Sequence, residues 1–109
     1  MRAVKRERIM GRYLCLWEIH HTAIPTSNEG WAQWEDMLGW LKEQMEGGFF
    51  KDWGQFIGEL RGYAVIEGSE MDVSRMAQRL IGVCSFHIHP IASVDQVGEM
   101  VRGLTRAGQ

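Results

Sequence analysis

The sequence predicts one α+β domain, because short β-prone segments alternate with amphipathic helical segments along 109 residues. Four segments rich in aromatic and β-branched residues are too short for helices. Three others repeat apolar residues every three or four positions, each after a capping signal. A chain of this length holds a single hydrophobic core. The predicted order is strand, helix, strand, strand, helix, strand and a trailing third helix.

The predicted strands are bounded by turn residues and by changes of periodicity. They cover residues 13–20, 49–57, 63–67 and 83–91, and the second is expected to be bulged at Gly54. The fourth alternates strictly between apolar residues and histidines, which is typical of a strand with two different faces.

Each predicted helix follows a capping box, a pattern in which two side chains satisfy the free N–H groups of the first turn. The boxes are Thr26-x-x-Glu29, Ser69-x-x-Asp72 and Ser93-x-x-Gln96. Gly47-Gly48 is expected to end the first helix, and Gly82 the second. The tryptophans of the first helix lie on its apolar stripe and are expected in the core.

This order is that of the ferredoxin-like βαββαβ sandwich, in which the antiparallel strands lie in the order 4-1-3-2 and both main helices cover one face. The other face is predicted to carry Leu14, Leu16 and Val65. Leaving such side chains in water forgoes about 1.5–3 kcal/mol each. A second copy that covers this face would form a dimeric α+β barrel, so we expect a homodimer or a higher homo-oligomer.

Three segments resemble the family of small stand-alone dimeric α+β barrel proteins: Trp17-Glu18-Ile19, residues 61–68 and residues 86–91. This family is similar in fold to muconolactone isomerase and to the stress-responsive α+β barrel proteins. The resemblance covers residues 12–104 in element order. It implies a homodimer with a cleft lined by the open sheet face, and it carries over no catalytic residue.

Four titratable groups are predicted to share the open face. If Phe86 faces the core, the parity of the strands places Glu18, His20, His87 and His89 together on the other side, with Glu18 beside His87. A carboxylate beside imidazoles suits general acid–base catalysis. The same set suits a divalent metal, or polar residues in a wet dimer interface, and the three interpretations remain open.

Asp52, Arg61 and Tyr63 are further candidates for ligand binding. Arg61 would anchor a carboxylate through paired hydrogen bonds, and Tyr63 would donate a hydroxyl into the cleft. The expected function is therefore to bind or act on a small organic molecule in the cleft. A non-catalytic homodimerising or ligand-sensing module is the alternative, and divalent metal binding a second. Whether the protein is an enzyme stays open, and no cofactor is predicted.

Composition excludes several other classes. The net charge of −2 and the pI near 6.1 give no basic face for a nucleic acid, and no apolar run is long enough to cross a bilayer. Cys15 and Cys84 lack metal or redox spacing, which indicates reduced core thiols and a cytoplasmic protein. Residues 1–10 are expected to form a disordered arm, and residues 11–109 the domain.

Overall fold

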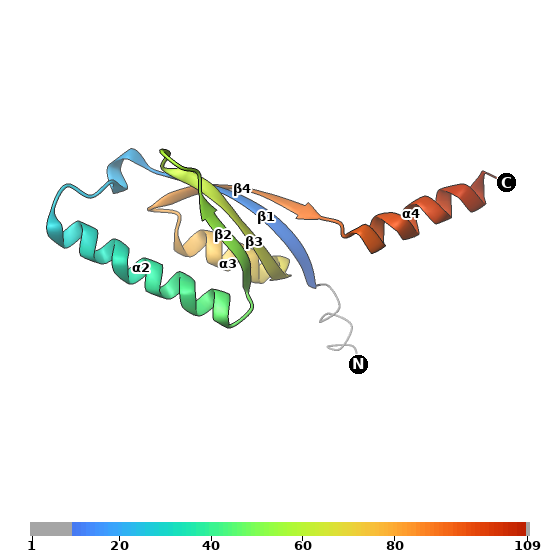
Figure 1. The fold of residues 1–109 in the computed structure, drawn as a ribbon, viewed down its shortest axis with the longest axis horizontal. Helices are drawn as coiled ribbons and strands as arrows, with labels where there is room; N and C mark the ends of the chain where they lie inside the picture. Colours follow the sequence, from blue (N-terminus) through green and yellow to red (C-terminus); the bar gives the residue numbers. More distant parts are fainter. Residues whose placement is uncertain (1–9, 109) are drawn as a thin grey trace.

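The computed structural model describes residues 10–108, which form one antiparallel sheet with helices around it (Figure 1). The strands are β1 (Met10–Ile19), β2 (Phe50–Gln55), β3 (Arg61–Ser69) and β4 (Cys84–Ile91). Their order in the sheet, β2-β3-β1-β4, is the predicted one. The α+β class is thereby confirmed, and the arrangement is compatible with a ferredoxin-like fold.

Two helices cover one face of the sheet and a third projects away from it (Figure 1). The covering helices are α2 (Asn28–Glu46) and α3 (Glu70–Arg79), and the projecting helix is α4 (Val94–Ala107); a short 3-10 turn, η1 (His21–Ala23), follows β1. The radius of gyration is 17.7 Å, compared with about 13 Å for a compact domain of this length. The projection of α4 accounts for the elongated shape. None of the helices in residues 10–108 is long and apolar enough to span a membrane.

Two of the three predicted capping boxes are confirmed. At α3 the amide of Asp72 donates to Ser69 Oγ (3.1 Å), and the amide of Ser69 donates to Asp72 Oδ2 (3.3 Å). At α4 the amide of Gln96 donates to Ser93 Oγ (3.1 Å), and the amide of Ser93 donates to Gln96 Oε1 (2.7 Å). These reciprocal bonds fix where each helix begins.

Two helix boundaries differ from the prediction. The N-cap of α2 is Ser27 rather than Thr26, because Ser27 Oγ accepts a hydrogen bond from the amide of Gly30 at 3.1 Å. The end of α3 does not use Gly82. The helix stops at Arg79 with Leu80 as its C-cap, and turn residues follow before β4.

The predicted bulge in β2 is real but lies elsewhere. Phe50 pairs with Ile66 and Asp52 with Val65, so the extra residue is Lys51 rather than Gly54. Gly54 has a different role. A Cβ at this position would lie 2.6 Å from Cε1 of Tyr63, so the glycine makes room for that ring.

The core lies between the sheet and the two covering helices. Its buried members are Tyr13, Cys15, Leu41, Phe50, Ala64, Ile66, Val73 and Met76. Leu41 is the buried residue of α2. The expectation that the tryptophans of α2 are core residues is wrong for Trp31, which is 52% exposed, while Trp34 and Trp40 are half-buried. The N-terminal half of α2 therefore rests loosely on the sheet.

The predicted N-terminal arm, residues 1–10, lies outside the described residues except for Met10. Met10 is not part of an arm, because it begins β1 and pairs with Ser69 of β3.

Candidate functional site

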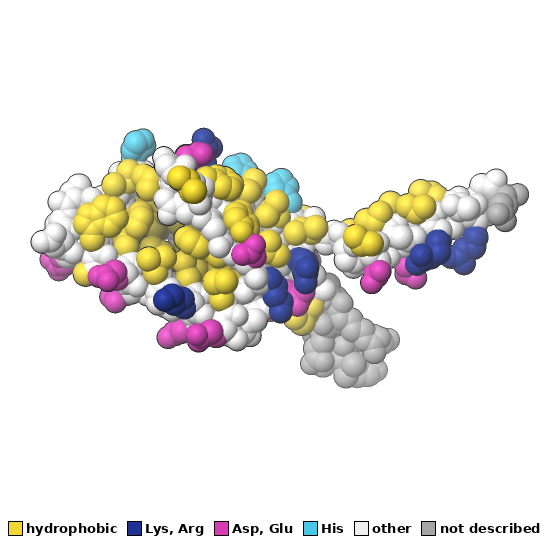
Figure 2. All heavy atoms as spheres, in the orientation of Figure 1, with side chains coloured by type: hydrophobic (Ala, Val, Ile, Leu, Met, Phe, Trp, Pro, Cys, Tyr) yellow, Lys and Arg dark blue, Asp and Glu magenta, His cyan; other side chains and the backbone are white. Residues whose placement is uncertain are grey.

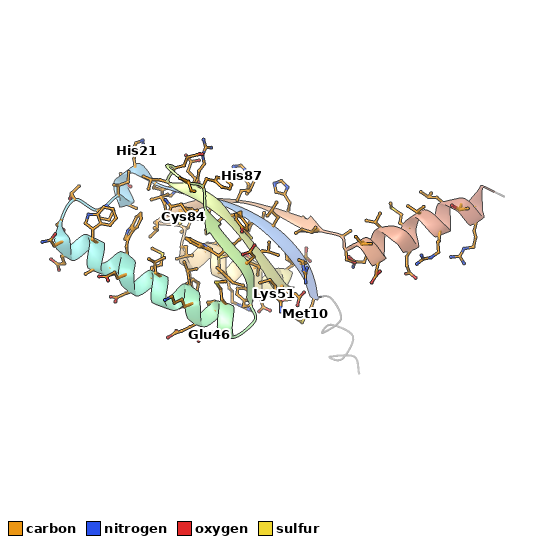
Figure 3. All side chains as sticks on the ribbon, viewed as in Figure 1. Met10, His21, Glu46, Lys51, Cys84 and His87 are labelled. Carbon is orange, nitrogen blue, oxygen red and sulfur yellow. The ribbon has the colours of Figure 1, made fainter. Side chains whose placement is uncertain are left out.

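The predicted site residues of β1 and β4 lie on the open face of the sheet, as their parity requires. His87 is opposite Leu16 and His89 opposite Leu14, while Phe86 and Trp17 pair on the core side. Figure 3 shows His87 pointing away from the helices. The two imidazoles are therefore interleaved with leucines on this face.

The predicted register between Glu18 and His87 is wrong. Glu18 lies opposite Ser85, and His87 is two positions further along β4. β1 ends at Ile19, opposite Cys84, one residue before the predicted end. A shift of two residues keeps every side chain on its face but separates the carboxylate from the imidazole along the strand.

His20 lies just beyond the paired part of β1. It follows the last residue of β1 and precedes η1, and its amide donates to the carbonyl oxygen of Val83 at 2.8 Å. Its neighbour His21 lines a pocket of about 140 Å³ together with Glu18 and Arg61. His21 is thus a candidate that sequence reasoning passed over, although the His20-His21 doublet was visible.

The three predicted ligand-binding residues already hold partners. The Tyr63 hydroxyl donates to Asp52 Oδ2 at 2.7 Å, and this hydrogen bond is the main cause that raises the pKa of Tyr63. Arg61 Nε donates to Glu59 Oε1 at 2.7 Å, and the same bond raises the pKa of Arg61. A ligand on this face would have to compete with these contacts or add to them.

The far end of the open face carries a charged cluster. Glu67 accepts a hydrogen bond from Arg12 at 2.9 Å and lies 3.5 Å from Lys51 Nζ. The bond from Arg12 is the main cause that lowers the pKa of Glu67. Along the paired strands β1 and β3, Arg12 lies opposite Glu67 at one end and Glu18 lies opposite Arg61 at the other. The two charged pairs therefore flank the apolar middle of the open face.

Metal binding finds no support in the side-chain arrangement. Within residues 10–108, no three His, Cys, Asp or Glu residues come together closely enough to hold an ion. His87 and His89 offer two imidazoles on one strand, but no third ligand joins them. A zinc site needs at least three protein ligands.

A cavity lies on the other side of the sheet, between it and helices α2 and α3. This helix-layer cavity has a volume of about 120 Å³, and its walls include Trp17, Trp34, Leu38, Leu41, Trp53 and Phe86. The rings of Trp17 and Trp53 are stacked, with centroids 5.3 Å apart and 10° between planes. Figure 2 shows hydrophobic side chains gathered between α2 and the sheet.

The cavity is bordered by a thiol and continues toward η1. Burial raises the pKa of Cys84, one of its lining residues, to about 11, so this thiol is neutral near pH 7. A second pocket, of about 560 Å³, lies under the η1–α2 connection and shares Trp34, Met37 and Leu80 with the first. The loose N-terminal half of α2 is what leaves this space.

Sequence reasoning missed the helix-layer cavity because the residues that line it have the spacing of an ordinary core. Trp34, Leu38 and Leu41 recur at helical intervals, which predicts packing and gives no sign of a void. The size of the tryptophans was the one sign of a cavity in the sequence. Large rigid rings leave gaps when the side chains of the facing strand are small, as at Ala64.

No known protein family, no curated protein and no solved structure matches this chain significantly. The comparisons therefore give no support to the relatives that its segments resemble. What the structure shows is a small α+β fold.

Proposed function

We propose that the protein binds a small uncharged organic molecule in the helix-layer cavity. The observation that carries the proposal is a void of about 120 Å³ walled by a stacked tryptophan pair and aliphatic side chains. Ligand pockets are typically apolar and aromatic with few polar groups. An apolar cavity of about 150 Å³ holds a benzene molecule, so the size suits one aromatic ring or a short aliphatic chain.

The lining favours an uncharged ligand. Among the described residues, no charged side chain lines the cavity. Gln55 contributes an amide side chain to the lining. The Gln55 Nε2 group already donates to the carbonyl oxygen of Glu59 at 2.6 Å. A carboxylate or an ammonium group in this space would lose its hydration without gaining a partner, which is costly.

The exposed rim of the cavity provides a route for the ligand. Leu38 of α2 is 49% exposed and Leu60, before β3, is 39% exposed, and both line the cavity. Since α2 is anchored mainly through Leu41, a small outward movement of its N-terminal half would admit a ring. Segments with few buried contacts open most readily.

Fluorobenzene, followed by fluorine NMR, tests the proposal. We expect a saturable shift or broadening of its signal with the parent protein. Leu38→Trp places a bulky ring at the rim and should weaken binding at least tenfold. The matched control Ala32→Trp adds the same ring at an exposed position of α2 that does not line the cavity, and should bind like the parent.

Benzoate serves as the charged counterpart and should bind at least tenfold more weakly than fluorobenzene. Absence of saturable fluorobenzene binding would reject the proposal. Equal binding by Leu38→Trp and the parent would also reject it, because the probe would then sit elsewhere.

We propose as a second function that the open sheet face mediates self-association. Support comes from Leu16, 37% exposed, and from half-buried Leu14 and Val65, which form the apolar middle of that face. The acid–base role predicted for Glu18, His20, His87 and His89 depends on this assembly, since only a covered face forms a cleft around them. Sedimentation velocity tests the assembly, and a monomer at micromolar concentration would reject it.

The polar residues are tested separately. His87→Ala and Glu18→Gln should leave the fold of each copy unchanged, because both side chains are exposed in the single chain. If the cleft binds a polar molecule, both variants should weaken binding of any anion or metal that the parent retains. Parent-like binding by both would reject the assignment of these residues.

A further inference from the structure

Helix α4 carries an apolar stripe that nothing among the described residues covers. The stripe consists of Val94, Val97, Met100, Val101 and Leu104, which are 88%, 42%, 58%, 50% and 65% exposed. No residue of α4 in the described chain is buried. The charged residues Asp95, Glu99, Arg102 and Arg106 lie on the opposite side of the helix. Figure 2 shows this segregation along the projecting helix.

A stripe with this spacing is the usual packing surface of a helix. A 14-residue helix standing alone in water is marginally stable, because most helix stability in proteins comes from packing an apolar face. Five large apolar side chains on a charged helix therefore indicate that α4 functions against another surface.

The same chain offers a second uncovered apolar surface, the open sheet face. Its middle holds Leu14, Leu16 and Val65, and it ends in charged groups on both sides. The stripe of α4 and the open face look toward the same side of the molecule, as the hydrophobic side chains of α4 in Figure 2 and the direction of His87 in Figure 3 show. Both surfaces are thus presented to one approaching partner.

We propose that α4 of one copy packs its stripe on the open sheet face of a second copy, and that the second copy reciprocates. This inference rests on the proposed self-association and assigns the segment that performs it. The stripe and the face belong to one chain, so a twofold arrangement satisfies both surfaces on both copies with one kind of contact.

The connection to β4 directs α4 toward another copy. Only Ala92 and Ser93 lie between β4 and α4, and Ser93 is extended, with φ −75° and ψ 168°. The capping box between Ser93 and Gln96 holds this geometry, so α4 continues outward from the end of β4 and away from its own sheet. Reversal onto its own face would require this connection to change.

The area of these contacts approaches that of a small specific dimer. A helix of 14 residues is about 21 Å long and about 10 Å wide, so it covers roughly 200 Å² of a flat surface. Two such contacts bury this area on four surfaces, the two helices and the two sheet faces. Because side chains make these surfaces uneven, the total buried area is on the order of 1,000 Å², near the lower limit for specific interfaces.

Complementation between two defective variants tests the exchange. Val97→Asp/Val101→Asp disables the stripe, and Leu16→Asp disables the face. Each alone should sediment as a monomer at concentrations where the parent is a dimer. Mixed together they should associate more strongly than either variant alone, because only the mixture brings an intact α4 onto an intact face, while the other contact of the mixed pair is defective on both sides. Arg102→Asp, on the charged side of α4, is the matched control and should dimerise like the parent.

The outcomes separate this inference from the proposals above. A stripe variant that still dimerises alone, beside a face variant that does not, would overturn the exchange while retaining self-association through the sheet. A monomeric parent would overturn both. Circular dichroism verifies that each variant is folded, and Val65→Asp replaces Leu16→Asp if the latter unfolds. Fluorobenzene binding on the other side of the sheet is independent of all these results.

Discussion

Gly62 of β3 lies opposite Trp17 of β1, and the absence of a side chain at Gly62 provides the space in which the indole lies. A Cβ at Gly62 would lie 2.6 Å from Cζ2 of Trp17 and would also collide with the carbonyl oxygen of Gly54. Trp17 in turn stacks on Trp53 and donates from Nε1 to the carbonyl oxygen of Tyr63 at 3.1 Å. One glycine therefore sets the position of a principal wall of the helix-layer cavity.

Gly62→Ala should destabilise the protein by about 1–3 kcal/mol or more, because the methyl group meets both backbone and a constrained ring. Chemical denaturation measures the change. Gly39→Ala is the control, since a Cβ there meets nothing within 4 Å and lies in α2. It should stabilise the protein by up to about 1 kcal/mol. Equal effects of the two substitutions would contradict the close packing of Gly62 against Trp17.

Trp17→Ala should cost about 3–5 kcal/mol of unfolding free energy, because the side chain is 7% exposed and its removal leaves a cavity beside Trp53. Trp31→Ala, at a position 52% exposed on α2, should cost less than about 1 kcal/mol. The difference between the two denaturation curves checks the prediction. A large effect at Trp31 would mean that the N-terminal half of α2 packs more tightly than the structure shows.

Both cysteines should be unreactive in the folded protein. Burial raises the pKa of Cys15 and of Cys84 to about 11, so roughly one thiol in a thousand is ionised at pH 8. A thiol reagent such as dithionitrobenzoate should label neither residue rapidly in native protein and both after unfolding in guanidinium. Rapid labelling of Cys84 alone would show that the cavity opens widely to solvent.

The ion pair between Arg12 and Glu67 should stabilise the protein at neutral pH and fail in acid. The folded-state pKa of Glu67 is lowered below its ordinary value of 4.5, mainly by the hydrogen bond from Arg12. Its contribution is therefore complete above that value and is lost as the pH falls through the folded-state pKa. A double-mutant cycle with Arg12→Ala and Glu67→Gln should show coupling at pH 7 and none near pH 2.

Salt provides the second check on this pair. The side chains of Arg12 and Glu67 are 53% and 37% exposed to solvent, so the coupling at pH 7 should shrink when the ionic strength is raised to 1 M. Coupling that persists at low pH would contradict an ionic origin.

Periodicity and caps predicted the elements of this fold well, because they depend on local contacts. Ser69 and Ser93 act through residues three positions away, so the sequence contains both partners of each capping bond. The faces of β1 and β4 were likewise predictable from alternation. Alternation cannot distinguish two registers that differ by two residues, because both leave every side chain on the same face. For this reason Glu18 was predicted beside His87, whereas it lies opposite Ser85.

The cavity depends on distances between layers, which no local pattern encodes. Whether Trp34 fills the space above Ala64 or stands away from it is decided by the path of α2 across the sheet. That path depends on Leu41, Phe50 and the turn after Gly47 together, because they anchor only the C-terminal half of the helix. The spacing of apolar residues along α2 is the same whether the helix packs closely on the sheet or leaves a cavity.

The capping box of α4 would affect how quickly and how selectively two copies associate in the proposed exchange of helices. A tail that must fold while it binds spends part of its contact energy on ordering itself. Here the hydroxyl of Ser93 and the amide of Gln96 already hold the first turn, so in the proposed exchange α4 would meet the second copy with its valines already aligned. Loosening that turn would then weaken the proposed association without altering any atom of the contact surface.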